Sequence, residues 1–179
     1  MAMALLVNFI GFQVGWFACV LGAANDKELL GMIIALGVII YHVVTQGDSR
    51  KELKLVLAAT AIGLLWETWV LNLDILRYPS HSELLFWPPS WLIMMWALFA
   101  TTINLSMGWL KGRWVLSVFM GAVFGPLAFI GGEKLGAVVF LDSTQSIVTL
   151  SIGWGLLMPL LLWIAERINH NFNSQENAR

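Results

Sequence analysis

One apolar run, residues 87–109, constrains the fold of this chain more than any other stretch. It starts with Pro88 and Pro89, is bracketed by Trp87 and Trp109, and is long enough to cross a bilayer, which takes about 20 residues. Its second half carries four polar side chains: Thr101, Thr102, Asn104 and Ser106. Each costs free energy in hydrocarbon unless a protein group satisfies it. We therefore expect other membrane spans to surround this one.

The composition indicates that the bilayer is the solvent of the whole chain. Of its 179 residues, 59% are hydrophobic and 12% are charged, against about 45–50% and about 25% in soluble domains. At about 20 residues per crossing, the chain has room for six spans and no extramembrane domain. The net charge of −1 gives no basic field for nucleic acid. We therefore predict an all-α fold, a polytopic bundle of six transmembrane helices, with no nucleic-acid partner.

Polar or charged linkers separate six apolar segments. The first lacks the positive charge that begins a signal peptide, so we interpret it as a retained span, although Leu21-Gly-Ala-Ala24 resembles a cleavage site. The expected spans are residues 3–24, 29–45, 53–73, 89–110, 114–130 and 146–168. Residues 1–168 then form a single transmembrane domain, and residues 169–179 form a polar cytoplasmic tail.

The distribution of positive charges predicts the orientation. Six spans put seven Lys and Arg on the face of the two termini: Arg50, Lys51, Lys54, Lys111, Arg113, Arg167 and Arg179. The opposite face receives three: Lys27, Arg77 and Lys134. Because cytoplasmic loops carry the excess of Lys and Arg, we expect both termini in the cytoplasm. The apolar patch within residues 131–141 is too short to span, and the sequence leaves open whether it re-enters the membrane.

Five polar side chains inside the expected spans are the candidates for a polar cluster or ligand site: Asn8, Gln13, Glu67, Thr101 and Asn104. An ionised carboxylate at membrane depth costs a few kcal/mol or more, so Glu67 is either a functional carboxyl or a structural or interfacial one. Asn8 and Asn104 are expected at similar depth, where two amides can hydrogen-bond between helices, on the order of 1 kcal/mol. Packing is the favoured interpretation of this pair, and a ligand or proton path is the alternative.

Other reactive side chains give weaker signals. Cys19 lies in an apolar run and is interpreted as a packed thiol. His42 is interpreted as an interfacial residue near a helix end, in preference to a ligand or proton carrier. His81-Ser82-Glu83, together with other acidic residues of the outer side, is a weak candidate for a metal or proton site. The three histidines lack metal-ligand spacing, and no phosphate loop, nucleotide fingerprint or serine elbow is present. We expect no metal and no cofactor.

The first segment also carries a small-residue motif. Gly11-Phe-Gln-Val-Gly15 allows close helix approach, and it suits either packing inside the bundle or a homo-oligomer. The expected partners are membrane lipid and, as alternatives, a second copy of the chain or another membrane protein.

Several motifs together resemble a family of small bacterial inner-membrane proteins with a domain of unknown function. They are Asn8-Phe9 with Phe12-Gln13 and Trp16, Pro89-Ser-Trp91, Leu98-Phe-Ala-Thr-Thr-Ile-Asn104 with Trp109, and Gly125-Pro-Leu-Ala128 with Gly132 and Leu135-Gly-Ala137. The resemblance covers most of the chain and implies a multi-pass protein of the bacterial inner membrane. Members often have a histidine after the asparagine of the fourth segment, where this chain has Leu105. Some members lie beside genes for fatty-acid modification, which favours a lipid-related role.

Three functions follow as hypotheses. The leading one is a membrane protein that binds a lipid or an apolar metabolite, or that assists a lipid-modifying enzyme, because one small polar cluster lies in an otherwise apolar bundle. The second is a small proton-coupled transporter with Glu67 as the titrating group. The third is a membrane-embedded lipid-modifying enzyme with Glu67 or Asn104 in its site. The sequence does not identify the ligand or catalytic residues.

Overall fold

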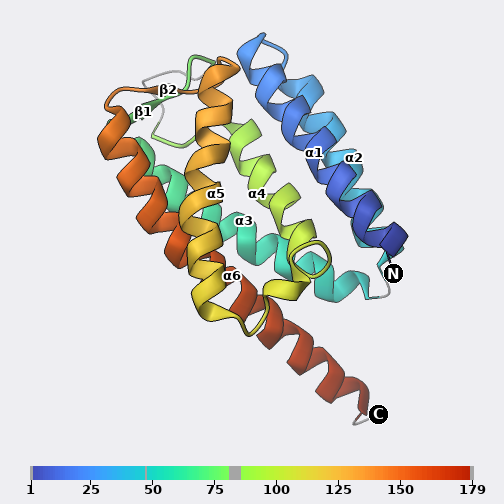
Figure 1. Ribbon diagram of the computed structural model, residues 1–179. Coiled ribbons are helices and arrows are strands. Elements are labelled where there is room, and N and C mark those ends of the chain that lie inside the picture. The colour runs from blue at the N-terminus through green and yellow to red at the C-terminus, as the bar shows by residue number, and fades with distance from the viewer. Residues whose placement is uncertain (1, 47, 81–85, 178–179) are drawn as a thin grey trace.

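The computed structural model describes residues 2–46, 48–80 and 86–177, with side chains described up to Phe172. Within this part the chain is an all-α bundle, as predicted (Figure 1). Its helices are α1 (Ala2–Ala24), α2 (Glu28–Thr45), α3 (Ser49–Leu71), α4 (Ser90–Ile103), α5 (Trp114–Lys134) and α6 (Ser143–Asn177), with a 3-10 turn η1 (Gly108–Leu110) and strands β1 (Leu76–Arg77) and β2 (Val139–Phe140). All the helices except α4 are long and apolar enough to cross a membrane. The chain is therefore a multi-pass membrane protein.

Helix α4 lies in the middle of the bundle. It contacts α1, α2, α3 and α6, and Figure 1 shows it between the α1–α2 pair on one side and the α5–α6 pair on the other. Most of its side chains are buried, including Trp91, Trp96 and Leu98. The expectation that other helices surround this stretch is confirmed.

The end of α4 differs from the prediction. The sequence predicts a helix over residues 89–110, but α4 stops at Ile103 after 14 residues, about 21 Å at 1.5 Å per residue, against a hydrocarbon core of about 30 Å. In a continued helix, the Thr101 carbonyl would accept the N–H of Leu105. Here Asn8 Nδ2 donates to that carbonyl at 3.0 Å, and Leu105 N donates to Thr102 instead. Contacts from a distant helix thus stabilise the break.

The start of α3 also differs, and it matters for the site. The carboxylate of Asp48 accepts the backbone N–H groups of Arg50 and Lys51, at 3.1 and 3.2 Å, which satisfies donors that a helix N-terminus leaves free. This cap begins α3 at Ser49, four residues before the expected start. Glu52, which we assign to a loop from the sequence, is therefore in the first turn of a helix and faces the bundle interior.

Tryptophan rings lie against glycines where helices approach closely. A Cβ added to Gly63 of α3 would meet the Trp96 ring at 2.1 Å, and one added to Gly153 of α6 would meet the Trp66 ring at 1.8 Å. Trp154 of α6 covers Gly125 of α5 in the same way. These contacts tie α3, α4, α5 and α6 together and leave no room for a methyl group.

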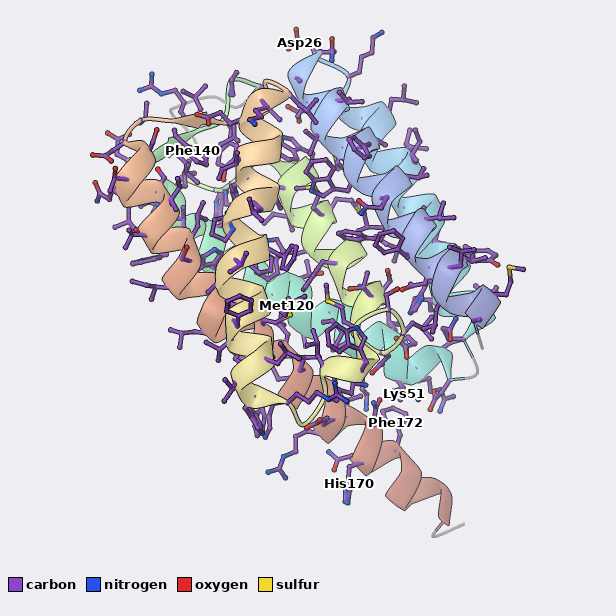
Figure 2. The ribbon with its side chains drawn as sticks, viewed as in Figure 1. Asp26, Lys51, Met120, Phe140, His170 and Phe172 are labelled. Carbon is purple, nitrogen blue, oxygen red and sulfur yellow. The ribbon has the colours of Figure 1, made fainter. Side chains whose placement is uncertain are left out.

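Residues 131–141, which the sequence leaves open as a re-entrant piece, form the end of α5, a turn and a strand. Gly136 takes a positive φ of 88°, and β2 then pairs antiparallel with β1, with Leu76 opposite Phe140. Ala137 and Val138 are buried. This ribbon lies at the end of the bundle that also holds the α1–α2 turn with Asp26 (Figures 1 and 2).

The predicted boundary at residue 168 does not coincide with the end of α6, which continues to Asn177. Lys54 Nζ lies 4.5 Å above the ring of Phe172, so the first part of the predicted tail packs on α3. Figure 2 shows Lys51, His170 and Phe172 at this same end, opposite the ribbon.

Candidate functional site: a buried polar network

Polar side chains from most parts of the bundle meet at the end opposite the ribbon. The helices α1, α2, α3 and α6 contribute to this cluster, together with the segment between α4 and α5, residues 104–113, which we call the α4–α5 junction. We define the polar network as Asn8, His42, Glu52, Asn104, Ser106, Lys111 and Asn169. Long-range tertiary contacts, not a local motif, therefore assemble the site.

Glu52 is the charged centre of the network. Its Oε2 lies 3.1 Å from His42 Nε2, and its Oε1 accepts a hydrogen bond of 2.8 Å from Asn104 Nδ2. Glu52 and His42 are 4% and 3% exposed. A buried carboxylate is tolerated when both oxygens are hydrogen-bonded or paired, and here each oxygen has a partner from a different part of the chain.

Asn8 connects His42 to the end of α4. Its Nδ2 donates to the Thr101 carbonyl at 3.0 Å and lies 3.5 Å from His42 Nδ1. Its Oδ1 accepts from the hydroxyl and the backbone N–H of Ser106. This amide orientation makes His42 Nδ1 an acceptor, so that Nε2 carries the proton and donates to Glu52. The hydrogen bonds thus select a neutral imidazole beside an ionised carboxylate.

Asn104 extends the network toward α6. Its Oδ1 accepts from Lys111 Nζ at 2.5 Å and from Asn169 Nδ2 at 3.1 Å. Burial lowers the pKa of the Lys111 ammonium, while the charges of Glu52 and Glu166 act in the opposite direction. The Oδ1 of Asn169 is buried and has no hydrogen-bond partner within the described residues. The network therefore retains an unused acceptor next to its cation.

Glu67 belongs to a separate site. It follows Glu52 by fifteen residues on α3, roughly 22 Å along the axis, and its side chain is fully buried. Trp96 Nε1 donates to its Oε1 at 3.0 Å, and the Tyr78 hydroxyl lies 3.5 Å from its Oε2. Burial, and then the nearby Glu67 carboxyl, raise the pKa of the Tyr78 phenol well above its ordinary value. Trp96 stacks on Trp154 with ring centroids 4.9 Å apart, so aromatic rings cover this carboxyl.

The structure brings together three of the five candidates from the sequence. Asn8, Thr101 and Asn104 meet in or at the network, although the two amides are joined through His42 and Glu52 and not directly. Glu67 lies in its own site, and Gln13 of α1 is half-buried without a hydrogen bond to the described part of the protein. His81-Ser82-Glu83, the weak metal or proton candidate, lies outside the described residues.

Five members of the network are not among the candidates from the sequence: His42, Glu52, Ser106, Lys111 and Asn169. The interpretation of His42 as an interfacial residue is wrong, because its side chain is 3% exposed and lies against Glu52. The available signal was Asp48-Ser49, a capping sequence that starts α3 early and puts Glu52 ten residues after His42 on the facing helix. No comparable local signal marks Lys111 or Asn169. Their positions depend on where α4 ends and on how far α6 continues.

A groove of about 500 Å³ lies between α3 and α4 on the ribbon side of the network. Its lining residues are Thr60, Leu64, Trp87, Pro88, Ser90, Ile93, Met94 and Ala97. The hydroxyl of Thr60 donates to the Val56 carbonyl at 2.7 Å and is therefore satisfied within its helix. The volume falls in the range of small-molecule sites, about 300–1,000 Å³, and the groove opens outward from the bundle.

The described residues hold no group of three His, Cys, Asp or Glu placed to share a metal ion. A family model described as "Protein of unknown function (DUF2878)" matches residues 5–160. No curated protein and no solved structure matches the chain.

Proposed function

This chain belongs to the DUF2878 family of unknown function, which carries no activity over to it, and we propose that it binds the acyl chain of a membrane lipid in the α3–α4 groove. The observation that carries this proposal is the groove itself, about 500 Å³ between two helices of the bundle. Both walls come from apolar helices, and the opening faces the outside of the bundle. In a membrane, the molecules that reach such an opening are hydrocarbon chains.

The ends of the groove indicate how a lipid is held. Trp87 and Ser90 lie where α4 begins, and Ala97 and Thr60 lie deeper in the bundle. Tryptophan favours the membrane–water interface, so the headgroup belongs at the Trp87 end. We place the protein in a bacterial inner membrane with both termini in the cytoplasm, because both termini lie at the end of the bundle that is rich in Lys and Arg. The groove then serves the outer leaflet, where the protein binds a lipid or apolar metabolite and presents it to a lipid-modifying enzyme.

Filling the groove tests this proposal. Ala97→Phe adds a ring between α3 and α4, and we expect labelling of the purified protein by a phosphatidylethanolamine with a photoactivatable acyl chain to fall about tenfold, the factor that corresponds to about 1.4 kcal/mol. In the wild type, mass spectrometry should place the label on peptides that contain Ile93 or Met94. The matched control is Leu65→Phe, at a side chain that is 73% exposed on α3 outside the groove. Equal labelling of all three proteins would exclude the groove as the site.

A second function, proton-coupled transport through Glu67, is favoured by the complete burial of this carboxyl on a spanning helix. Glu67→Gln keeps an oxygen for the Trp96 bond and has nearly the same volume, so we expect it to fold. In pyranine-loaded proteoliposomes, we expect the wild type to dissipate a pH gradient and Glu67→Gln to do so at the rate of empty liposomes. If the variant and the wild type dissipate the gradient equally, Glu67 is not the titrating group.

A further inference from the structure

No residue of the polar network lines the α3–α4 groove, and the geometry of the network supports a different activity. We propose that His42 is a proton-binding residue and that the Asn8 amide transmits its protonation to the α4–α5 junction. This inference does not depend on the lipid proposal, because it uses other residues at the opposite end of α4.

One ring nitrogen of His42, Nδ1, carries no proton in this arrangement. In the structure, His42 Nε2 donates to Glu52, and Nδ1 faces the Nδ2 of Asn8 at 3.5 Å. Nδ1 is therefore the atom that accepts a further proton. Imidazole is also the side chain that titrates nearest to neutral pH, and the ring of His42 contacts the buried carboxylate of Glu52.

A proton on Nδ1 changes the hydrogen bonding of Asn8. An N–H on Nδ1 cannot face the NH₂ group of Asn8, so the amide must turn about its Cβ–Cγ bond and present Oδ1 to the ring. Oδ1 then also faces the Thr101 carbonyl, and the NH₂ group faces the backbone N–H of Ser106, where Oδ1 accepted before. Two favourable contacts become repulsive. Proton binding thus weakens the hold of α1 on the end of α4.

The other groups around the His42 ring differ in charge. From α3, the Glu52 carboxylate faces His42 directly and favours the added proton. From α1 and α4, the facing groups are the uncharged Asn8 and Thr101. The positive charge of Lys111, which bonds to Asn104, disfavours the added proton. Lys51 and Glu166 lie at the same end, and their effects are weaker and of opposite sign. Of these charged groups, Glu52 is the one that contacts the ring directly, 3.1 Å from Nε2, so the site can accept the proton.

The element that responds to the proton is the α4–α5 junction. The α4–α5 junction consists of turns and the short η1, with local hydrogen bonds such as Met107 N to Thr102 O. Such segments open more readily than helices. The bonds of Asn8 with the Thr101 carbonyl and with the Ser106 backbone N–H tie this segment to α1. When they are lost, we expect the junction to open locally while the surrounding helices remain formed.

Hydrogen exchange of the protein in lipid nanodiscs measures this response. After correction for the intrinsic pH dependence of exchange, we expect peptides covering residues 104–110 to exchange about tenfold faster near pH 5 than near pH 8, as loss of one to two hydrogen bonds implies. His42→Gln should abolish the difference, because glutamine keeps a donor toward Glu52 and does not titrate. His170→Gln, the same change on the exposed end of α6, should retain it.

A second variant separates proton binding from its transmission. In Asn8→Leu, we expect the ring resonances of His42 in an NMR titration to shift with pH as in the wild type, while exchange at residues 104–110 no longer depends on pH. The proposal is overturned if the wild-type junction shows no pH dependence, if His42 does not titrate, or if Asn8→Leu keeps the full response. The wild type and Asn8→Leu decide the matter even if His42→Gln does not fold.

Discussion

Replacing Gly121 by alanine should lower the free energy of unfolding by about 1–3 kcal/mol, the range for inserting atoms into a well-packed core. The added Cβ would lie 2.1 Å from the carbonyl oxygen of Trp154 and 2.8 Å from Cβ of Met158. Because the nearest obstacle is backbone, no side-chain rotation relieves the clash, and α5 must move away from α6. Unfolding in mixed micelles, followed by tryptophan fluorescence, measures the change.

Gly37→Ala is the matched control for this substitution. Gly37 is exposed in the middle of α2, and a Cβ there meets nothing within 4 Å. Alanine has a better helix propensity than glycine by about 1 kcal/mol, so this variant should be as stable as the wild type or more stable. If Gly121→Ala unfolds at the same denaturant concentration as Gly37→Ala, the prediction that α6 leaves no room for a methyl group at Gly121 is wrong.

The positions of the helices follow from the sequence because hydropathy reports which segments avoid water. Their ends do not follow as well, since tertiary contacts with distant residues can decide them. Helix α4 stops at Ile103 because Asn8, nearly a hundred residues earlier, takes the carbonyl of Thr101. No window of sequence around Ile103 contains that information. By contrast, the early start of α3 has a local signal in the sequence, because the carboxylate of Asp48 caps the helix.

The same distinction explains the candidate site. Helical spacing and depth predict that Asn8 and Asn104 lie at one level, and both belong to the polar network. The partners that join them were not predictable from depth alone, because His42 and Glu52 lie near the ends of their helices, where polar residues are usually exposed to water. Their burial results from the α4–α5 junction and α6, which cover this end. The burial of Glu67 likewise depends on the ring of Trp96.

Asn104→Leu should be the most destabilising single change in the network. The substitution removes the donor to Glu52 and the acceptor shared by Lys111 and Asn169, with little change in volume. Leaving a buried group without its hydrogen-bond partner costs about 1–3 kcal/mol, and more when the group is charged. Asn104→Leu does this to both Glu52 and Lys111, so we expect a loss of about 3–5 kcal/mol in the micelle assay. Asn72→Leu is the control, because this exposed asparagine makes a single bond to the Thr68 carbonyl, worth about 1 kcal/mol.

A double-mutant cycle distinguishes the loss of these hydrogen bonds from general damage to the helix end. If Asn104 acts by satisfying Glu52, the cost of Asn104→Leu should shrink in a Glu52→Leu background, because the carboxylate that it leaves unpaired is then absent. The residual cost reports the contacts with Lys111 and Asn169. Costs that add within about 0.5 kcal/mol would contradict the coupling. Asn104 would then stabilise the bundle by terminating α4, and not by holding the buried carboxylate.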